Sequence, residues 1–161
     1  MTKTMAELLR SIPQVGKVEW LGVRPAARAE IEMRQQIEVD VEHSILGDHY
    51  RGAAGSKRQV TLLQSEHLDV LQKILGVSIV PEMLRRNIVV SGINLQSLKG
   101  HEFQIGGAIL KGTGNCPPCS RMEENLGPGG YNAMRGHGGL TAQIVQSGTV
   151  CVGDRVRLHN S

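Results

Sequence analysis

Alternating hydrophobic and polar residues are the dominant pattern of this chain, and they predict several short β-strands. The alternation recurs over residues 16–25, 58–64, 87–95, 102–112, 140–146 and 149–158. Because successive side chains of a strand point to opposite faces, a period of two is typical of strands with one buried face. Glycine and asparagine residues separate these runs, as expected for turns.

Three segments carry helical spacing instead. Residues 5–12 place four apolar side chains on one face, which predicts a short leading helix or a docked arm. Ser65 can cap a second helix and Gly76 can end it, and the apolar residues between them also share a face. Pro81 can open a further short helix that runs through Arg85.

The order of these elements indicates the fold class. Strands and helices do not alternate regularly, which disfavours a parallel sheet built from βαβ units. Many short strands with few helices are typical of a β-barrel with helical additions. We therefore expect a mainly β, barrel-like domain over residues 18–158 with a few short helices, preceded by an N-terminal helix or arm at residues 1–17. The length of 161 residues suits one domain.

Composition narrows the possible partners. Hydrophobic residues make up 40% of the chain but aromatic residues only 2%, so the core must be aliphatic. Scarce aromatic side chains argue against base stacking on single-stranded nucleic acid. The net charge of +3 comes without a block of Lys and Arg, which suits a small anionic ligand better than a nucleic-acid duplex. We expect no nucleic-acid partner.

The sequence also indicates in which cellular compartment the protein works. No stretch approaches the roughly 18 consecutive apolar residues of a membrane span, and the first residues lack the pattern of a secretory signal. Three cysteines do not make a disulfide framework. We expect a cytoplasmic protein with no membrane partner.

The segment from Cys116 to Cys119, Cys-Pro-Pro-Cys, permits several interpretations. A closed zinc site needs four ligands, and the chain has no second suitably spaced pair of ligands. A thioredoxin-like dithiol needs an α/β fold, which the pattern does not indicate. The two thiols could also simply be packed in a loop. Alternatively, one cysteine works as a thiolate beside the cation of Arg121, and the glycine-rich stretch that follows, with Arg135 and His137, holds a phosphorylated ligand. The residues alone leave these alternatives open.

Five motifs in order give the chain a resemblance to a known family. They are WLGVRP at 20–25, ILGDHYRG at 45–52, RQVTLLQSEHL at 58–68, LRRNIVVSGINLQSLKG at 84–100 and GTVCVGDRV at 148–156. Together with the thiol segment, they resemble the MOSC family, named for the C-terminal domain of molybdenum cofactor sulfurases. The resemblance covers about residues 18–157. It implies a mainly β, barrel-like fold, which agrees with the alternating pattern.

The resemblance also implies site residues. The family's signature cysteine follows a proline and corresponds to Cys119, which the resemblance implies carries sulfur or binds the molybdenum of a pyranopterin cofactor, whereas Cys116 has an auxiliary role. The candidate cofactor-binding residues are Asp48, His49, Arg86, Asn87, Arg121, Arg135 and His137. Asp48 could instead cap a turn, and Arg86 could form a structural salt bridge. We expect residues 47–51, 85–87 and 119–139 to converge on one pocket.

Three functions follow as expectations. The leading one is a stand-alone MOSC domain that binds molybdenum cofactor through the Cys119 thiolate and reduces N-hydroxylated compounds with electrons from a separate redox partner. The alternatives are a persulfide sulfur carrier and a non-catalytic cofactor-binding module. We expect no pyridoxal phosphate on this chain, because it lacks an aminotransferase domain, and no iron–sulfur cluster, because three cysteines do not form a cluster site.

Overall fold

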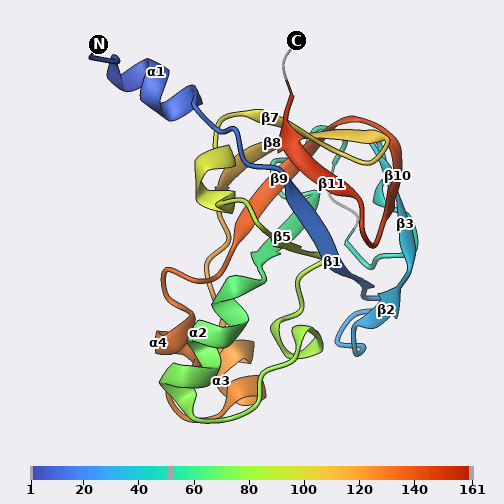
Figure 1. The fold of residues 1–161 in the computed structure, drawn as a ribbon. Coiled ribbons are helices and arrows are strands. Elements are labelled where there is room, and N and C mark those ends of the chain that lie inside the picture. The colour runs from blue at the N-terminus through green and yellow to red at the C-terminus, as the bar shows by residue number, and fades with distance from the viewer. Residues whose placement is uncertain (1, 51–52, 160–161) are drawn as a thin grey trace.

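Seven strands close a β-barrel in the computed structural model, which describes residues 2–50 and 53–159 (Figure 1). Around the barrel they are β1 (Gly16–Val23), β6 (Ile88–Ser91), β5 (Val60–Gln64), β9 (Leu140–Gln146), β8 (Ala108–Asn115), β7 (Glu102–Ile105) and β11 (Arg155–Leu158), which pairs back with β1. Neighbouring strands are antiparallel except β5 and β6, which α2 (Glu66–Leu75) helps to connect. The expectation of a mainly β barrel with few helices is confirmed.

Four further strands extend this frame. β2 (Glu32–Arg34) pairs with the end of β1, and a small separate sheet contains β10 (Gly148–Cys151), β3 (Gln36–Asp40) and β4 (Ser44–Ile45). The strands predicted from the alternating pattern do not include β2, β3 or β4. All three strands are short, β2 and β3 contain charged residues, and β3 takes its main partner, β10, from more than a hundred residues further along the chain.

The barrel interior is aliphatic, as the composition predicts. Leu21, Leu62, Ile88, Ile105 and Leu110 are fully buried there, and Phe103 is the aromatic residue among them. Burial of one side chain of this size contributes about 1.5–3 kcal/mol to folding. The interior is therefore a packed core and leaves the ligand sites to the barrel's ends and outer surface.

A second hydrophobic core lies outside the barrel, where the helices gather at one end (Figure 1). Trp20, Leu63 and Val89 point outward from β1, β5 and β6, because neighbouring strand residues alternate between the two cores. Packed against them are α2, the 3-10 helix η1 (Pro81–Leu84), α3 (Ser120–Leu126) and α4 (Gly130–Met134). Met122 and Met134 are both buried in this core, which holds the late glycine-rich segment in place.

The expected helices are present, with differences in detail. Gly76 ends α2 in a left-handed conformation, whereas the Ser65 side chain makes no capping hydrogen bond. A capping box between Thr4 and Glu7 begins α1 (Met5–Arg10), which stands away from the barrel and buries none of its residues. A further 3-10 helix, η2 (Leu95–Leu98), follows β6. Among the described residues no helix combines the length and apolar character that a membrane crossing requires.

Candidate functional site

A cavity of about 430 Å³ lies where distant segments of the chain meet beside the barrel. The cavity, called here the arginine cavity, is lined by Arg24, Tyr50, Arg58, Gln59, Thr61, Arg85, Arg86, Asn87, Cys116, Pro117 and Cys119. Parts of all three segments that were expected to converge contribute to it. Arg51 and Gly52, at the end of the predicted Gly-Asp-His motif, lie outside the described residues. The cavity combines four arginines with two thiol-bearing residues.

The thiol segment, Cys116 to Cys119, forms one wall of this cavity in an extended conformation. β8 ends just before Cys116, whose backbone N–H donates to the Gly139 carbonyl at 2.9 Å and whose side chain is buried. Cys119 is exposed, and it precedes α3 without a side-chain hydrogen bond to the helix. Its φ of −117° and ψ of 172° continue the extended backbone. The accessible thiol of the segment is therefore that of Cys119.

The two prolines hold the thiols apart. Proline fixes φ, and the residue before a proline favours extended backbone. At ~3.1 Å per residue, three such steps place the Cα atoms of Cys116 and Cys119 about 9 Å apart. A disulfide requires Cα atoms within about 7 Å, so these two cysteines can bond directly only if the backbone moves.

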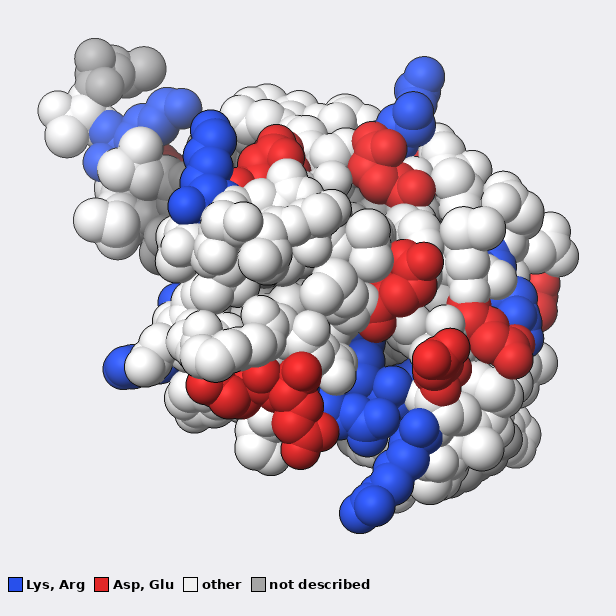
Figure 2. Space-filling model, turned by 90° about the horizontal axis from the view of Figure 1, so that it is seen from below, with Lys and Arg blue, Asp and Glu red and all other residues white. Residues whose placement is uncertain are grey.

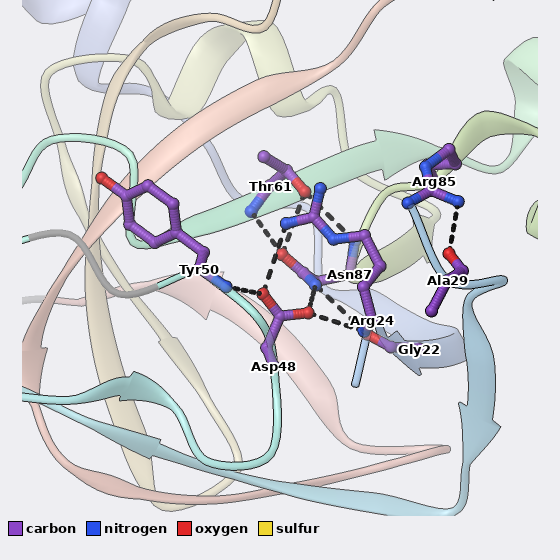
Figure 3. A network of polar contacts seen from close by, with 8 residues as sticks. All are labelled: Gly22, Arg24, Ala29, Asp48, Tyr50, Thr61, Arg85 and Asn87. Atoms are coloured by element: carbon purple, nitrogen blue, oxygen red, sulfur yellow. Dashed lines mark hydrogen bonds and ion pairs between the residues drawn. The ribbon is translucent and has the colours of Figure 1, made fainter. Parts of the chain in front are cut away.

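Asp48 and Asn87 form the buried polar floor of the site (Figure 3). The Asp48 carboxylate accepts hydrogen bonds from the Arg24 backbone N–H at 2.8 Å, the Tyr50 backbone N–H at 3.1 Å and the Asn87 amide at 3.4 Å. The same carboxylate pairs with the Arg24 guanidinium at 3.3 Å. Asp48 thus fixes the end of β1 and the loop at Tyr50 relative to the barrel.

The Asn87 side chain completes this network. Its Oδ1 accepts from the backbone N–H and the hydroxyl of Thr61, at 3.2 and 3.0 Å, and its Nδ2 also donates to the Gly22 carbonyl at 3.2 Å. The side chain therefore ties β1 to β5 at the start of β6. With these bonds Asn87 positions the cavity's other residues.

Arg86 is a buried cation without a carboxylate partner in the described part of the chain. Its guanidinium donates to the carbonyls of Gly138 at 2.9 Å, Leu84 at 3.2 Å and Pro117 at 3.4 Å. The salt bridge considered for Arg86 is thus absent among the described residues. Its charge is left to act on whatever occupies the cavity, and its bonds join the thiol segment to the glycine-rich loop.

Arg24 and Arg85 add donors that sequence reasoning did not select. The Nε of Arg24 is buried and has no hydrogen-bond partner within the described residues, which marks a place for an acceptor supplied by a ligand or water. Arg85 has a φ of 58° and donates to the Ala29 carbonyl at 2.8 Å (Figure 3). Backbone strain of this kind is concentrated at functional sites. Motif WLGVRP and the pair Arg85–Arg86 were the available signals for these two residues.

The charges around Arg85 shift its pKa in opposite directions. Burial lowers the pKa of Arg85, and the cations of Arg121 and Arg24 lower it further, whereas the negative charges of Cys119 and Asp48 act in the opposite direction. The Arg121 guanidinium donates to the Arg28 carbonyl at 3.4 Å. Crowded cations of this kind favour an anion among them.

A wider crevice of about 540 Å³ adjoins the arginine cavity at Arg85. Arg121 lines this crevice together with the carboxylates of Glu30 and Glu82. Figure 2, which views the molecule from the side of the helices, shows basic side chains gathered in a hollow between acidic groups. The approach to the arginine cavity is therefore of mixed charge, and its interior is positive.

Three predicted site residues lie elsewhere. His49 is exposed, and its backbone N–H bonds to the Arg24 carbonyl at 2.5 Å. Arg135 lines a different cavity, behind the thiol segment. The His137 ring packs edge-on against His67, with ring centroids 4.8 Å apart, and its Nδ1 lies 3.0 Å from the Ala133 carbonyl. Neither Arg135 nor His137 is among the residues that line the arginine cavity.

The donor set suits one kind of bound group better than a bare metal ion. Within residues 2–50 and 53–159, no cluster of three or more His, Cys, Asp or Glu side chains is arranged to hold a metal ion. One exposed thiol beside several arginines offers a single soft ligand with donors for phosphate oxygens. Cys119, Arg86 and the unpaired Arg24 Nε therefore fit a phosphorylated cofactor whose metal accepts a protein sulfur.

Comparison with known proteins agrees with the fold. The sequence model of the MOSC domain matches residues 49–157. The YuaD protein from Bacillus subtilis is 23% identical and superposes with a TM-score of 0.78, over 93% of this chain and 99% of its own. YiiM from Geobacillus stearothermophilus is 15% identical with a TM-score of 0.74, over 90% of this chain and 75% of its own. Such identities indicate a shared fold. No curated protein sequence gives a significant match.

Proposed function

This chain belongs to the MOSC domain family, and on that premise we propose that it binds a molybdenum cofactor, with the Cys119 thiolate as the protein's ligand to the metal. The observation that carries the proposal is the exposed Cys119 thiol on the wall of a cavity that four arginines also line. A thiolate is a soft ligand that suits molybdenum, and guanidinium groups match phosphate oxygens.

The residues of the cavity divide the work of binding. Arg86 and the Nε of Arg24 supply buried donors toward the cofactor's phosphate. Asp48 and Asn87 hold Arg24 and the strands in position and are themselves satisfied by protein groups. The fixed Cys116 backbone and the two prolines orient Cys119, so that the thiol meets the cavity with little loss of conformational freedom on binding.

The bound cofactor supplies two-electron oxidation and reduction. We extend the proposal to the reduction of N-hydroxylated compounds, in which two electrons and two protons convert an N–OH group to N–H and water. The electrons come from a separate donor protein. The crevice lined by Glu30, Glu82 and Arg121 meets the arginine cavity at Arg85, and we assign it as the route for the substrate.

The exposure of Cys119 also favours a second candidate, a persulfide sulfur carrier. A persulfide on an exposed thiol can be handed to an acceptor, whereas Cys116 is only 3% exposed. The same binding geometry without turnover defines a third candidate, a non-catalytic cofactor-binding module. Chemical analysis of the isolated protein, together with a turnover assay, separates the three.

The test is to isolate the protein without oxygen and to measure molybdenum, pterin and sulfane sulfur. We expect the wild type to carry molybdenum and pterin, and Cys119→Ala and Cys119→Ser to lose the metal. Cys116→Ala should keep most of it, and Cys151→Ala, on a distant strand, is the matched control for removing a thiol. If Cys119→Ala retained the metal and Cys116→Ala lost it, the metal ligand would be Cys116 and the assignment to Cys119 would be wrong.

Two other results identify the alternatives. Sulfane sulfur on Cys119 without molybdenum identifies the sulfur carrier. Molybdenum and pterin that remain bound without turnover, with chemical reductants as well as protein donors, identify the binding module. If neither cysteine variant changes the metal or the sulfur content, the thiols have a packing role.

A further inference from the structure

We propose that a second cavity, behind the thiol segment, binds a small aromatic or heteroaromatic acid at a site separate from Cys119. This cavity, called here the glycine-loop cavity, has a volume of about 310 Å³. It shares Cys116 and Pro117 with the arginine cavity, but Cys119 is not among its lining residues. The proposal does not depend on the proposed function.

The backbone of the glycine loop gives the cavity a fixed floor. A Cβ atom at Gly138 would collide with the Cys116 carbonyl oxygen, and one at Gly139 with the Leu62 carbonyl oxygen. The loop is held there by the bond from Arg86 to the Gly138 carbonyl and by the bond from the Cys116 N–H to the Gly139 carbonyl. The floor is therefore formed before any ligand arrives, and only glycine allows the chain to approach so closely.

The side chains around this floor are free to bind. Arg135 directly follows α4, is exposed, and makes no side-chain hydrogen bond or ion pair with any described residue. The side chains of Gln96 and Asn115 also make no hydrogen bond with another described residue. All three side chains are exposed and no described protein group holds them, so they can turn toward a ligand in the cavity.

Charge and shape together indicate the ligand. Arg135 is the charged side chain of the described lining, so the cavity carries one uncompensated cation whose forked donors match a carboxylate. Tyr131 lines the cavity with an aromatic side chain that is 41% exposed, and its backbone is held because its N–H donates to the Glu123 carboxylate at 3.0 Å. The two amides can bond to polar groups on the edge of a ring.

The volume limits the ligand's size. Sites for drug-sized ligands span roughly 300–1,000 Å³, and this cavity lies at the lower end of that range. One ring with one acidic group fits that space better than a nucleotide. We therefore commit to a monocyclic acid, with the carboxylate on Arg135 and the ring against Tyr131.

The experiment titrates ¹⁵N-labelled protein with 4-hydroxybenzoate and follows the backbone amide signals. We expect saturable shifts at Gly136, Gly138 and Gly139. Arg135→Gln should weaken binding about tenfold or more, and Tyr131→Ala should weaken it as well. Both side chains are exposed, so the variants should keep the wild-type melting temperature. Arg58→Gln, in the arginine cavity, is the matched control and should leave the affinity unchanged.

Other results overturn the proposal. Equal affinity for 4-hydroxybenzamide, or for inorganic phosphate, would remove the requirement for a ring joined to an acid. Shifts confined to residues 85–87, or an unchanged affinity in Arg135→Gln, would place the probe elsewhere. A loss of pterin from Arg135→Gln isolated as the holoprotein would make this cavity part of the cofactor site, whereas absence of molybdenum from the wild type would bear on the proposed function alone.

Discussion

The arginine cavity and the glycine-loop cavity share one wall, yet they are built in opposite ways. In the first, buried side chains such as Asp48 and Asn87 hold one another through hydrogen bonds. In the second, the backbone of Gly138 and Gly139 is fixed, and side chains such as Arg135 are free. The difference teaches that a site can be preorganised either through its functional groups or through its shape.

The two designs have different sensitivities. Side-chain networks that are buried are costly to break, because each lost partner leaves a polar group unsatisfied. A site shaped by backbone tolerates changes at its free side chains and fails when the backbone must move. Substitutions that separate stability from binding can therefore test the comparison.

The largest expected effect is that of Gly139→Ala. Gly139 has a φ of 96°, which a side chain rarely adopts, and its Cβ would also collide with the Leu62 carbonyl. We expect a loss of more than about 4 kcal/mol in the free energy of unfolding, measured by urea denaturation.

Gly136→Ala is the matched control for that substitution. Gly136 has a similar φ of 80°, but open space surrounds the position of its Cβ. The backbone conformation alone should cost about 1–2 kcal/mol. Equal losses in the two variants would show that the close approach to Leu62 does not shape the cavity.

A smaller but still large effect is expected for Asp48→Ala. The substitution leaves the Arg24 guanidinium and several N–H groups without their acceptor. We expect a loss of about 3 kcal/mol in the free energy of unfolding, with Asp48→Asn in between because one oxygen remains. Arg135→Ala, in the other cavity, should change stability by less than about 0.5 kcal/mol. Similar losses for Asp48→Ala and Arg135→Ala would contradict the comparison.

The smallest effect concerns the contact between His67 on α2 and His137 on the glycine loop. Burial lowers the pKa of His67 from its ordinary value of 6.5, and His137 lowers it further, whereas Glu66 acts in the opposite direction. The unfolded chain therefore takes up the proton more readily than the folded one. Stability should be complete above pH 6.5 and should decline as the pH falls through the lowered pKa.

Urea denaturation between neutral and mildly acidic pH measures this slope. His67→Gln should flatten it, because that substitution removes the imidazole whose pKa is lowered. An identical slope in the wild type and in His67→Gln would show that burial of His67 beside His137 does not make the stability depend on pH.

Part of the fold could be predicted because the signal was local. Residues 60–64, 88–91 and 140–146 combine alternation with branched aliphatic side chains, and all became barrel strands. β3 has alternating Ile37 and Val39 among acidic residues, but it was missed because its strand pairing depends on the distant β10. The helix α4 lies in a segment whose glycines predict a loop, and Ala133 and Met134, buried in the second hydrophobic core, stabilise it there.

The candidate site, like the fold, could be predicted only in part. Resemblance to the family selected Cys119, Arg86 and Asn87, and all three line one cavity. Arg135 was expected beside Cys119 because it lies in the glycine-rich stretch that follows the thiols, but it lines the glycine-loop cavity, which among the described residues shares only Cys116 and Pro117 with the arginine cavity. Which side of a wall a residue faces depends on how distant segments pack, and a linear pattern does not contain that information.

The strand pair that closes the barrel determines when the newly made chain can fold completely. Gly16 and Lys17 of β1 pair with Val156 and Arg155 of β11, so the first and last barrel strands meet. At about 5–20 residues per second, the ribosome makes β11 on the order of ten seconds after β1. During that interval the barrel cannot close, and β1 keeps an open edge of the kind that invites wrong pairing. The nascent chain is thus most exposed to chaperones, and to neighbouring chains on the same messenger, until its final strand emerges.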